Sequence, residues 1–283
     1  MPFFQDLSLL AFPLILFSAF THAVYNALIK SAHDKLVARM LMALSSTILI
    51  GPLALFVPLP TPSLFAILGF TAVVHFLYQM AQIKSLHYAD YTLAYPVSRG
   101  TAPLLIAALS PFIFADQISA NQLVGIIIIS ASILSMGFSA PKGNGWGIVF
   151  ALITGVAIAA YTTIDAKGVR LAVNPATYIV WFFIFDSFVI SAFTLSRHWQ
   201  RFKSRAPREW KLGLFNGLLG ICTFGSAMLA FKYGNAPVMA ALRETSVLFA
   251  AFIGYLFMGE KVSGARMLAI IGIGVGVIVI RLA

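Results

Sequence analysis

Hydrophobic residues occur along this chain in long continuous runs, separated by short stretches that contain charge, proline or glycine. A helix needs about 20 apolar residues to cross the hydrocarbon core of a bilayer. Runs of about this length predict ten membrane-spanning helices. They lie near residues 9–29, 37–57, 64–86, 91–113, 121–139, 145–164, 175–195, 210–231, 237–258 and 264–281.

The composition supports a membrane protein. The chain is 60% hydrophobic and 10% charged, whereas a soluble domain carries about 25% charged residues. The net charge of +10 could indicate a nucleic-acid partner, but the basic residues lie mainly in short loops between apolar runs, as the positive-inside rule describes. We therefore predict an all-α polytopic membrane protein that contacts membrane lipid and no nucleic acid.

The sequence contains an internal repeat. Arg99 recurs as Arg243, 144 positions later, and the same offset gives 8 identities in 31 positions without a gap. We predict two five-helix repeats, residues 1–140 and 141–283. Because five is an odd number of crossings, the second repeat enters the membrane in the opposite sense. Inverted repeats of this kind are typical of transporters that work by alternating access around a midplane site.

The loop charges predict an orientation. The loops after odd-numbered spans and the adjoining helix ends hold 13 Lys and Arg residues, against 4 on the other side. The positive-inside rule then places both termini outside the cytoplasm. The larger group is Lys30, Lys35, Arg39, Lys84, Lys142, Arg197, Arg201, Lys203, Arg205, Arg208, Lys211, Lys261 and Arg266; the smaller is Lys167, Arg170, Lys232 and Arg281.

No enzymatic motif occurs in the sequence. The zinc-protease, serine-hydrolase, phosphate-loop and dinucleotide-binding patterns are absent, and the five histidines lack metal-ligand spacing. We therefore expect no enzyme, no cofactor and no metal. Without an ATP-binding loop, active transport by this chain would be secondary.

Arg99 and Arg243 are the main candidates for binding a substrate. A charge at the bilayer centre costs about 2.5–3.5 kcal/mol on insertion scales, and such residues are functional by default. The planar guanidinium binds carboxylate or phosphate through two hydrogen bonds, so the two arginines predict an anion site. The alternative is a structural role, in which each arginine pairs with a buried carboxylate or with backbone carbonyls.

Acidic residues also lie within the expected spans. Glu244 and Arg243 are adjacent and do not share a helix face, so we expect Glu244 to reach another span, with Arg99 as one partner. Glu244 could balance charge or carry a coupling proton. Asp186 lies among four phenylalanines and is a second candidate for either role. For Asp165 we expect a solvated helix end.

Polar residues at helical spacing predict a cavity wall. His22, Tyr25 and Asn26 lie on one face of the first span, and Gln79 belongs to a similar stripe on the third span. Tyr95 and Tyr161 are candidate aromatic walls. The alternative for any one of these residues is a hydrogen bond between helices, worth about 1 kcal/mol.

Two segments resemble the drug/metabolite transporter superfamily in its ten-span EamA-type branch. They are Ala94–Leu105, which contains Tyr95-Pro96-Val97-Ser98-Arg99, and Phe249–Lys261, which ends in Met258-Gly259-Glu260-Lys261. The resemblance implies export of a small metabolite across the bacterial inner (plasma) membrane, with protons as an optional coupling ion, and cytoplasmic termini. Combined with the paired arginines, it predicts transport of an amino acid or another organic anion. A lipid-linked carrier or flippase, and a multidrug exporter, are the alternatives.

Overall fold

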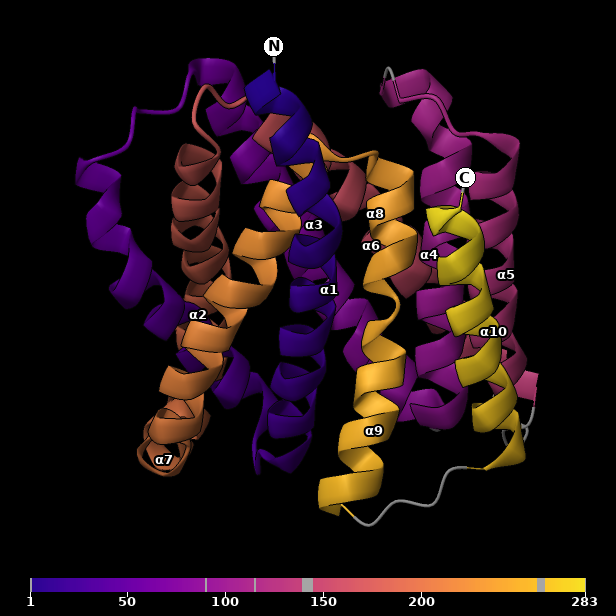
Figure 1. Cartoon of the computed structure of the whole chain (residues 1–283). Helices are drawn as coiled ribbons and strands as arrows, with labels where there is room; N and C mark the ends of the chain where they lie inside the picture. Colours follow the sequence, from indigo (N-terminus) through magenta and orange to yellow (C-terminus); the bar gives the residue numbers. More distant parts are fainter. Residues whose placement is uncertain (1, 90, 115, 139–144, 259–262, 283) are drawn as a thin grey trace.

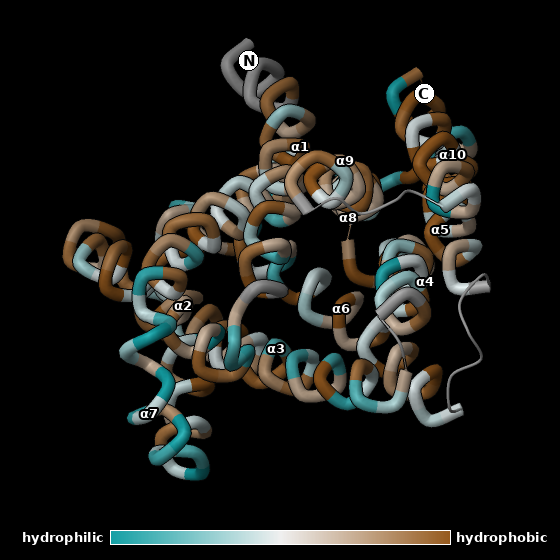
Figure 2. Tube along the Cα trace, turned by 90° about the horizontal axis from the view of Figure 1, so that it is seen from below, coloured by the Kyte–Doolittle hydropathy of each residue, from teal (hydrophilic) through white to brown (hydrophobic). Residues whose placement is uncertain are grey.

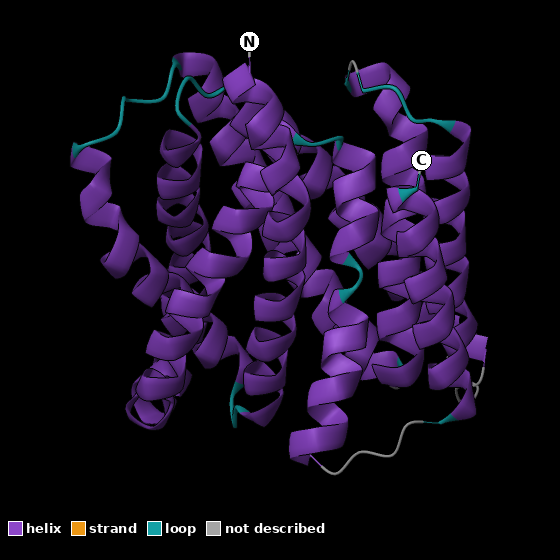
Figure 3. Ribbon diagram, in the orientation of Figure 1, coloured by secondary structure: helices purple, strands orange, loops and turns teal. Residues whose placement is uncertain are grey.

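The computed structural model describes residues 2–89, 91–114, 116–138, 145–258 and 263–282. Within these ranges the protein is all-α, without strands (Figure 3). The first half contains α1 (Pro2–Ser31), α2 (Lys35–Ile50), a 3-10 turn η1 (Gly51–Leu55), α3 (Pro62–Tyr88), α4 (Tyr91–Ile113) and α5 (Ala120–Phe138). The second half contains α6 (Gly145–Leu171), α7 (Pro175–Tyr233), α8 (Ala236–Arg243), α9 (Ser246–Met258) and α10 (Gly264–Arg281).

Several helices begin where a polar cap precedes a proline. Thr61 caps α3 before Pro62, and Asn174 caps α7 before Pro175. Each cap side chain accepts a hydrogen bond from a free backbone N–H of the first turn. Proline suits the first helical position because it has no N–H to leave unpaired. These local signals fix the starts of the helices.

Eight helical segments in the described part of the chain are long and apolar enough to cross a membrane. One of them covers two of the expected spans. The expected helices 175–195 and 210–231 belong to α7, whose backbone departs from helical geometry at His198 (φ −134°, ψ 30°). The polar stretch between them is therefore helical and not a loop. α4, which contains Arg99 and three prolines, is not among the eight.

The expected span 237–258 is also interrupted. Glu244 and Thr245 separate α8 from α9. Their amides donate to the carbonyls of Ala241 and Leu242, three residues earlier rather than four. This tight turn holds Arg243 at the end of α8 and Glu244 just beyond it, so two charged side chains leave the backbone in the middle of an apolar segment.

The helices surround a central region that both halves of the chain line. α1 packs against α7 and α9, α3 against α6, α4 against α5 and α6, and α5 against α10. Viewed along the helices, α1, α3, α4, α6, α8 and α9 lie around the centre, while α5 and α10 lie at one side (Figure 2). Both termini lie toward the same end of the molecule (Figure 1).

α5 and α10 approach each other through glycine. A Cβ on Gly125 would meet the Gly276 carbonyl oxygen at 2.8 Å, and a Cβ on Gly276 would meet the Gly125 oxygen at 2.9 Å. Further along, Gly272 faces Ser132. Because residue numbers rise along α5 as they fall along α10, the two helices are antiparallel. Side chains at the contact would force them apart.

Charged networks join the elements at both ends of the bundle. At one end, the Arg201 guanidinium donates to both oxygens of Asp34, at 2.6 and 3.0 Å, and Glu209 accepts from the backbone amides of His33 and Asp34. Burial would raise the pKa of Asp34, but hydrogen bonds from Arg201 and from two backbone amides outweigh it and lower this pKa. The network ties the α1–α2 connection to the polar part of α7, where hydrophilic residues gather (Figure 2).

At the other end, Arg170 closes the last turn of α6 against both halves of the chain. Its guanidinium donates to both oxygens of Asp116, at 3.0 and 2.8 Å, and to the carbonyls of Phe231 and Gly234. Asp116 also accepts from the amide of Ala236 at the start of α8. Sequence analysis placed Arg170 among the loop charges and did not anticipate this role.

Candidate functional site

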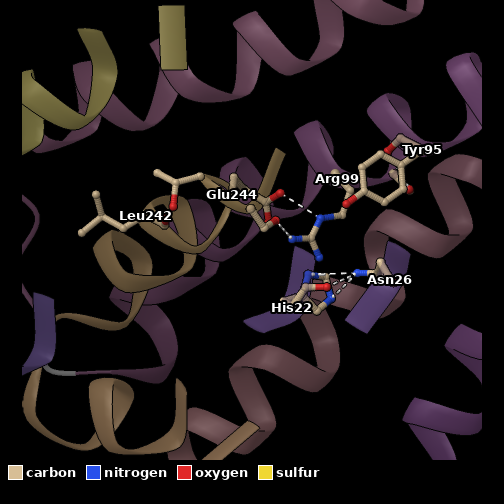
Figure 4. A network of polar contacts seen from close by, with 9 residues as sticks. His22, Asn26, Tyr95, Arg99, Leu242 and Glu244 are labelled. Atoms are coloured by element: carbon tan, nitrogen blue, oxygen red, sulfur yellow. Dashed lines mark hydrogen bonds and ion pairs between the residues drawn. The ribbon is translucent and has the colours of Figure 1, made fainter. Parts of the chain in front are cut away.

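Arg99 and Glu244 form a buried ion pair at the centre of the site. The Arg99 Nε atom lies 2.8 Å from Glu244 Oε2, and a second guanidinium nitrogen donates to Ser246 at 3.2 Å. Both residues are 4% exposed. The hypothesis that Glu244 reaches Arg99 is confirmed. The turn between α8 and α9 makes the contact possible, because it directs Glu244 toward α4 (Figure 4).

Arg243 has a different environment from its repeat counterpart. It is half-buried, and its Nε atom is fully enclosed without a hydrogen-bond partner among the described residues. Glu244 hydrogen-bonds to Arg99 and leaves Arg243 without a carboxylate of its own. The two arginines are therefore not equivalent: Arg99 forms an ion pair with Glu244, whereas Arg243 forms no ion pair with a described residue.

A small cavity separates these groups. Its empty volume is about 260 Å³, and α4, α6 and α8 line it together with the following turn. Both arginines, Glu244 and Tyr161 contribute to its wall. The remaining lining residues are Ala102, Pro103, Ile106, Ile158, Thr162 and Ala240. The cavity thus combines two guanidinium groups, one carboxylate and an aromatic ring within an apolar enclosure.

The α1 stripe lies beside the ion pair. The Asn26 amide nitrogen lies 3.2 Å from the His22 ring and donates to the His22 backbone carbonyl at 2.9 Å. Figure 4 places His22 and Asn26 next to Arg99, with the Tyr95 ring on its other side. The Arg99 guanidinium carbon lies 5.9 Å from the centre of the Tyr95 ring. The structure therefore brings three of the expected wall residues to the arginine.

Other expected site residues lie farther from the cavity. Tyr25 is buried in a separate apolar cluster beside Ile29, with its ring 6.0 Å from that of His22. Gln79 is half-buried on α3 and does not line the cavity. Asp186 is half-buried on α7, where it makes no hydrogen bond with any described residue. The Gly259-Glu260-Lys261 ending of the expected ninth span lies outside the described residues.

Asp165 was expected at a solvated helix end, and this expectation is wrong. The carboxylate is 1% exposed and accepts hydrogen bonds from Thr71 at 2.6 Å and Tyr178 at 2.8 Å. His75 Nε2 lies 2.9 Å from its second oxygen. The physical reason is that α6 continues to Leu171, so Asp165 occupies a helix interior. Its spacing of four residues from Tyr161 was a sequence signal for this inward face.

Arg39 was counted with the loop charges but lies within α2. Its guanidinium donates to the Gln82 side chain on α3 at 2.7 Å. Both residues are at least half-buried. A third arginine within an expected span therefore faces protein. Sequence analysis missed it because it lies close to the end of an apolar run.

Comparison with known families identifies the chain. The sequence model of the EamA-like transporter family matches twice, over residues 9–138 and 145–282. This chain belongs to that family. The EamA-like chain is accordingly an integral membrane protein and a transporter of small molecules rather than an enzyme. Its apolar helices and its partly charged central cavity agree with this role.

Relatives of the EamA-like chain support the same assignment. It is 26% identical over 185 residues to an "Uncharacterized transporter" of Archaeoglobus fulgidus, a match that covers 65% of this chain and 64% of the relative. It is 27% identical over 136 residues to an "Uncharacterized transporter in cobO 3'region" of Sinorhizobium sp, covering 46% of this chain and 94% of the relative. A solved crystal structure with 18% identity has the same fold, with a TM-score of 0.74 and 98% of each chain covered.

Proposed function

We propose that this protein is a secondary transporter that binds the acidic group of a small organic anion or zwitterion, such as an amino acid, at Arg243. The observation that carries the proposal is the unequal pairing of the duplicated arginines. Glu244 neutralises Arg99 and leaves the cavity with one uncompensated positive charge. A single carboxylate matches this charge, and its two oxygens fit the guanidinium fork.

The lining of the cavity favours an anionic metabolite over a cationic drug. It combines two guanidinium groups with one carboxylate. A multidrug cation would meet the uncompensated charge of Arg243. His22, Asn26 and Tyr95 would contact the remainder of the substrate beside Arg99, with Tyr161 as the facing wall.

Alternating access is the proposed mechanism. The two family matches in tandem and the antiparallel contact of α5 with α10 support ten crossings in two inverted halves, residues 1–140 and 141–283. The Arg170–Asp116 network joins the halves at one end and would break when that end opens. We propose export across a bacterial inner membrane as the direction, following the family resemblance.

A thermal-shift screen of the purified protein in detergent tests the binding site. Amino acids, dicarboxylic acids, sugar phosphates, organic cations and lipid headgroups are compared, since a ligand of the folded state raises its stability. We expect stabilisation by a carboxylate compound, weakened in Arg243→Lys and lost in Arg243→Ala. The matched control is Arg197→Ala, which removes an exposed arginine of α7 and should leave the shift unchanged.

Each of the other outcomes would indicate a different function. Stabilisation only by a phospholipid or a polyprenyl phosphate would replace the metabolite carrier with a flippase. Stabilisation only by organic cations would indicate a multidrug exporter. An Arg243→Ala variant that is stabilised as strongly as the wild type would refute the proposed anion site. Uptake of the stabilising compound into liposomes then gives the direction of transport.

A further inference from the structure

A buried carboxylate that three side chains contact by hydrogen bonds lies outside the cavity. Asp165 on α6 accepts from the Thr71 hydroxyl on α3, the Tyr178 hydroxyl on α7 and the His75 ring on α3. Three helices therefore meet at one side chain. Nothing in the proposed anion site requires this arrangement, and apolar residues would join the helices at a lower desolvation cost.

The geometry assigns a proton-binding atom. An ionised carboxylate can only accept hydrogen bonds, so His75 Nε2 carries the hydrogen that points at Asp165. The other ring nitrogen, Nδ1, is then the atom that can gain or lose a proton. Histidine is a common proton carrier in proteins because a ring nitrogen can gain and release a proton. Its side chain is 13% exposed, so a route for the proton remains.

Aromatic contacts connect His75 to the cavity. The centres of the His75 and Tyr161 rings lie 4.0 Å apart, and the two ring planes are tilted by 31°. The face of an aromatic ring attracts a cation, so a charge on His75 and the Tyr161 ring would interact. Tyr161 also lines the cavity that contains Arg243. One tyrosine therefore contacts the histidine and forms the wall of the anion site.

The remaining titratable and charged groups around His75 come from the neighbouring helices. α3 itself contributes Tyr78, whose ring centre lies 5.3 Å from that of Tyr161. The groups that act electrostatically on His75, Asp165 or Tyr161 are Tyr78 on α3, Tyr161 and Asp165 on α6, Tyr178 and Asp186 on α7, Arg99 on α4 and Arg243 on α8; Arg39 on α2 acts on Asp186. Tyr161 therefore interacts both with the carboxylate of Asp165 and with the two arginines.

We propose that the His75–Asp165 pair is the site at which this transporter binds a coupling proton. A proton from water adds to Nδ1 of His75 and gives an imidazolium that Asp165 holds as an ion pair; the same proton leaves from Nδ1 when the transporter opens to the other side. This inference rests on the proposed anion transport. It assigns proton binding to His75 and leaves Glu244 to balance the charge of Arg99.

Coupling follows from the positions of the charges. A proton on His75 adds a positive charge behind Tyr161, which strengthens the attraction of the cavity for an anion. By reciprocity, an anion in the cavity favours protonation of His75. Removal of the Arg243 charge must then also alter the protonation of His75, and this consequence can be measured without knowing the substrate.

The test is an NMR titration of the protein in detergent micelles with carbon-13 in the histidine rings. His75→Gln identifies the His75 signal. We expect this signal to respond to pH if His75 binds the proton, and Asp165→Asn to change that response. His87→Gln is the matched control, because His87 is an exposed histidine on the same helix. If His75→Gln fails to fold, replacement of the other four histidines identifies the His75 signal.

Arg243→Ala tests the link to the cavity, with Arg197→Ala as control. We expect the midpoint of His75 to move in the first variant and to stay unchanged in the second. If the His75 signal does not respond to pH, or if its response is the same in Asp165→Asn, Arg243→Ala and the wild type, the inference is overturned. The contact between His75 and Asp165 is then a structural hydrogen bond. Failure of the proposed function would be seen separately, as an absence of stabilisation by any carboxylate compound.

Discussion

Removal of Glu244 should destabilise this protein strongly, because it would leave the Arg99 charge buried without a partner. The two groups are 4% exposed, and 2.8 Å separates Arg99 Nε from the carboxylate. Loss of one partner of a buried pair typically costs about 3–5 kcal/mol. We therefore expect Glu244→Ala to lower the free energy of unfolding by about that amount.

The chain offers a more exposed pair for comparison. Arg201 contacts Asp34 at 2.6 Å, and the Arg201 side chain is 49% exposed, whereas that of Asp34 is 7% exposed. Two backbone amides also donate to Asp34, so Arg201→Gln leaves this carboxylate partly satisfied and should cost less than Glu244→Ala. Replacement of both central residues, as Arg99→Met with Glu244→Leu, removes the buried charges together and should recover much of the stability that Glu244→Ala loses.

Reversible unfolding in mixed micelles, followed by circular dichroism as the denaturing detergent increases, gives the free energies. A coupling energy for Arg99 and Glu244 comes from the two single variants and the double variant. If Glu244→Ala costs no more than Arg201→Gln, the Arg99 charge is solvated by water in the cavity. That result would refute the reasoning that the protein neutralises one arginine and leaves the other free.

Three further predictions concern the scaffold. Gly276→Ala should cost about 1–3 kcal/mol in the same unfolding assay by overpacking, since its Cβ would meet the Gly125 carbonyl oxygen. Gly274 has open space around it, so Gly274→Ala should be neutral or stabilising. Equal effects of the two variants would contradict the antiparallel contact. The pKa of Asp34 is lowered in the folded state, so its contribution is complete above about pH 3.9, the unfolded value, and is lost as the pH falls through the lower folded value. Asp34→Asn should therefore reduce the loss of stability in acid, and an unchanged acid-unfolding profile would disprove this. A reporter fused after Ala283 should be non-cytoplasmic in cells, because 13 Lys and Arg residues lie on the side opposite the termini, against 4 on the side of the termini. A cytoplasmic signal would reverse the orientation.

Sequence alone determined the class of protein and the principal charges of the site. Runs of about 20 apolar residues leave no alternative to membrane-spanning helices, because backbone polar groups in lipid must be satisfied within the segment. The cost of burying an arginine singled out Arg99 and Arg243. Adjacent helical positions do not share a face, so the sequence predicted that Glu244 contacts another span, and Arg99 was among its expected partners.

Tertiary structure decided how those charges are used. The turn at Glu244 and Thr245 has no strong local signal, yet it separates the roles of two arginines that the repeat presents as equivalent. Asp165 and Arg39 were misplaced because the end of an apolar run does not reveal whether a helix continues into protein or into water. The depth of a polar group depends on which helices pack around it, and that packing joins residues far apart in the chain.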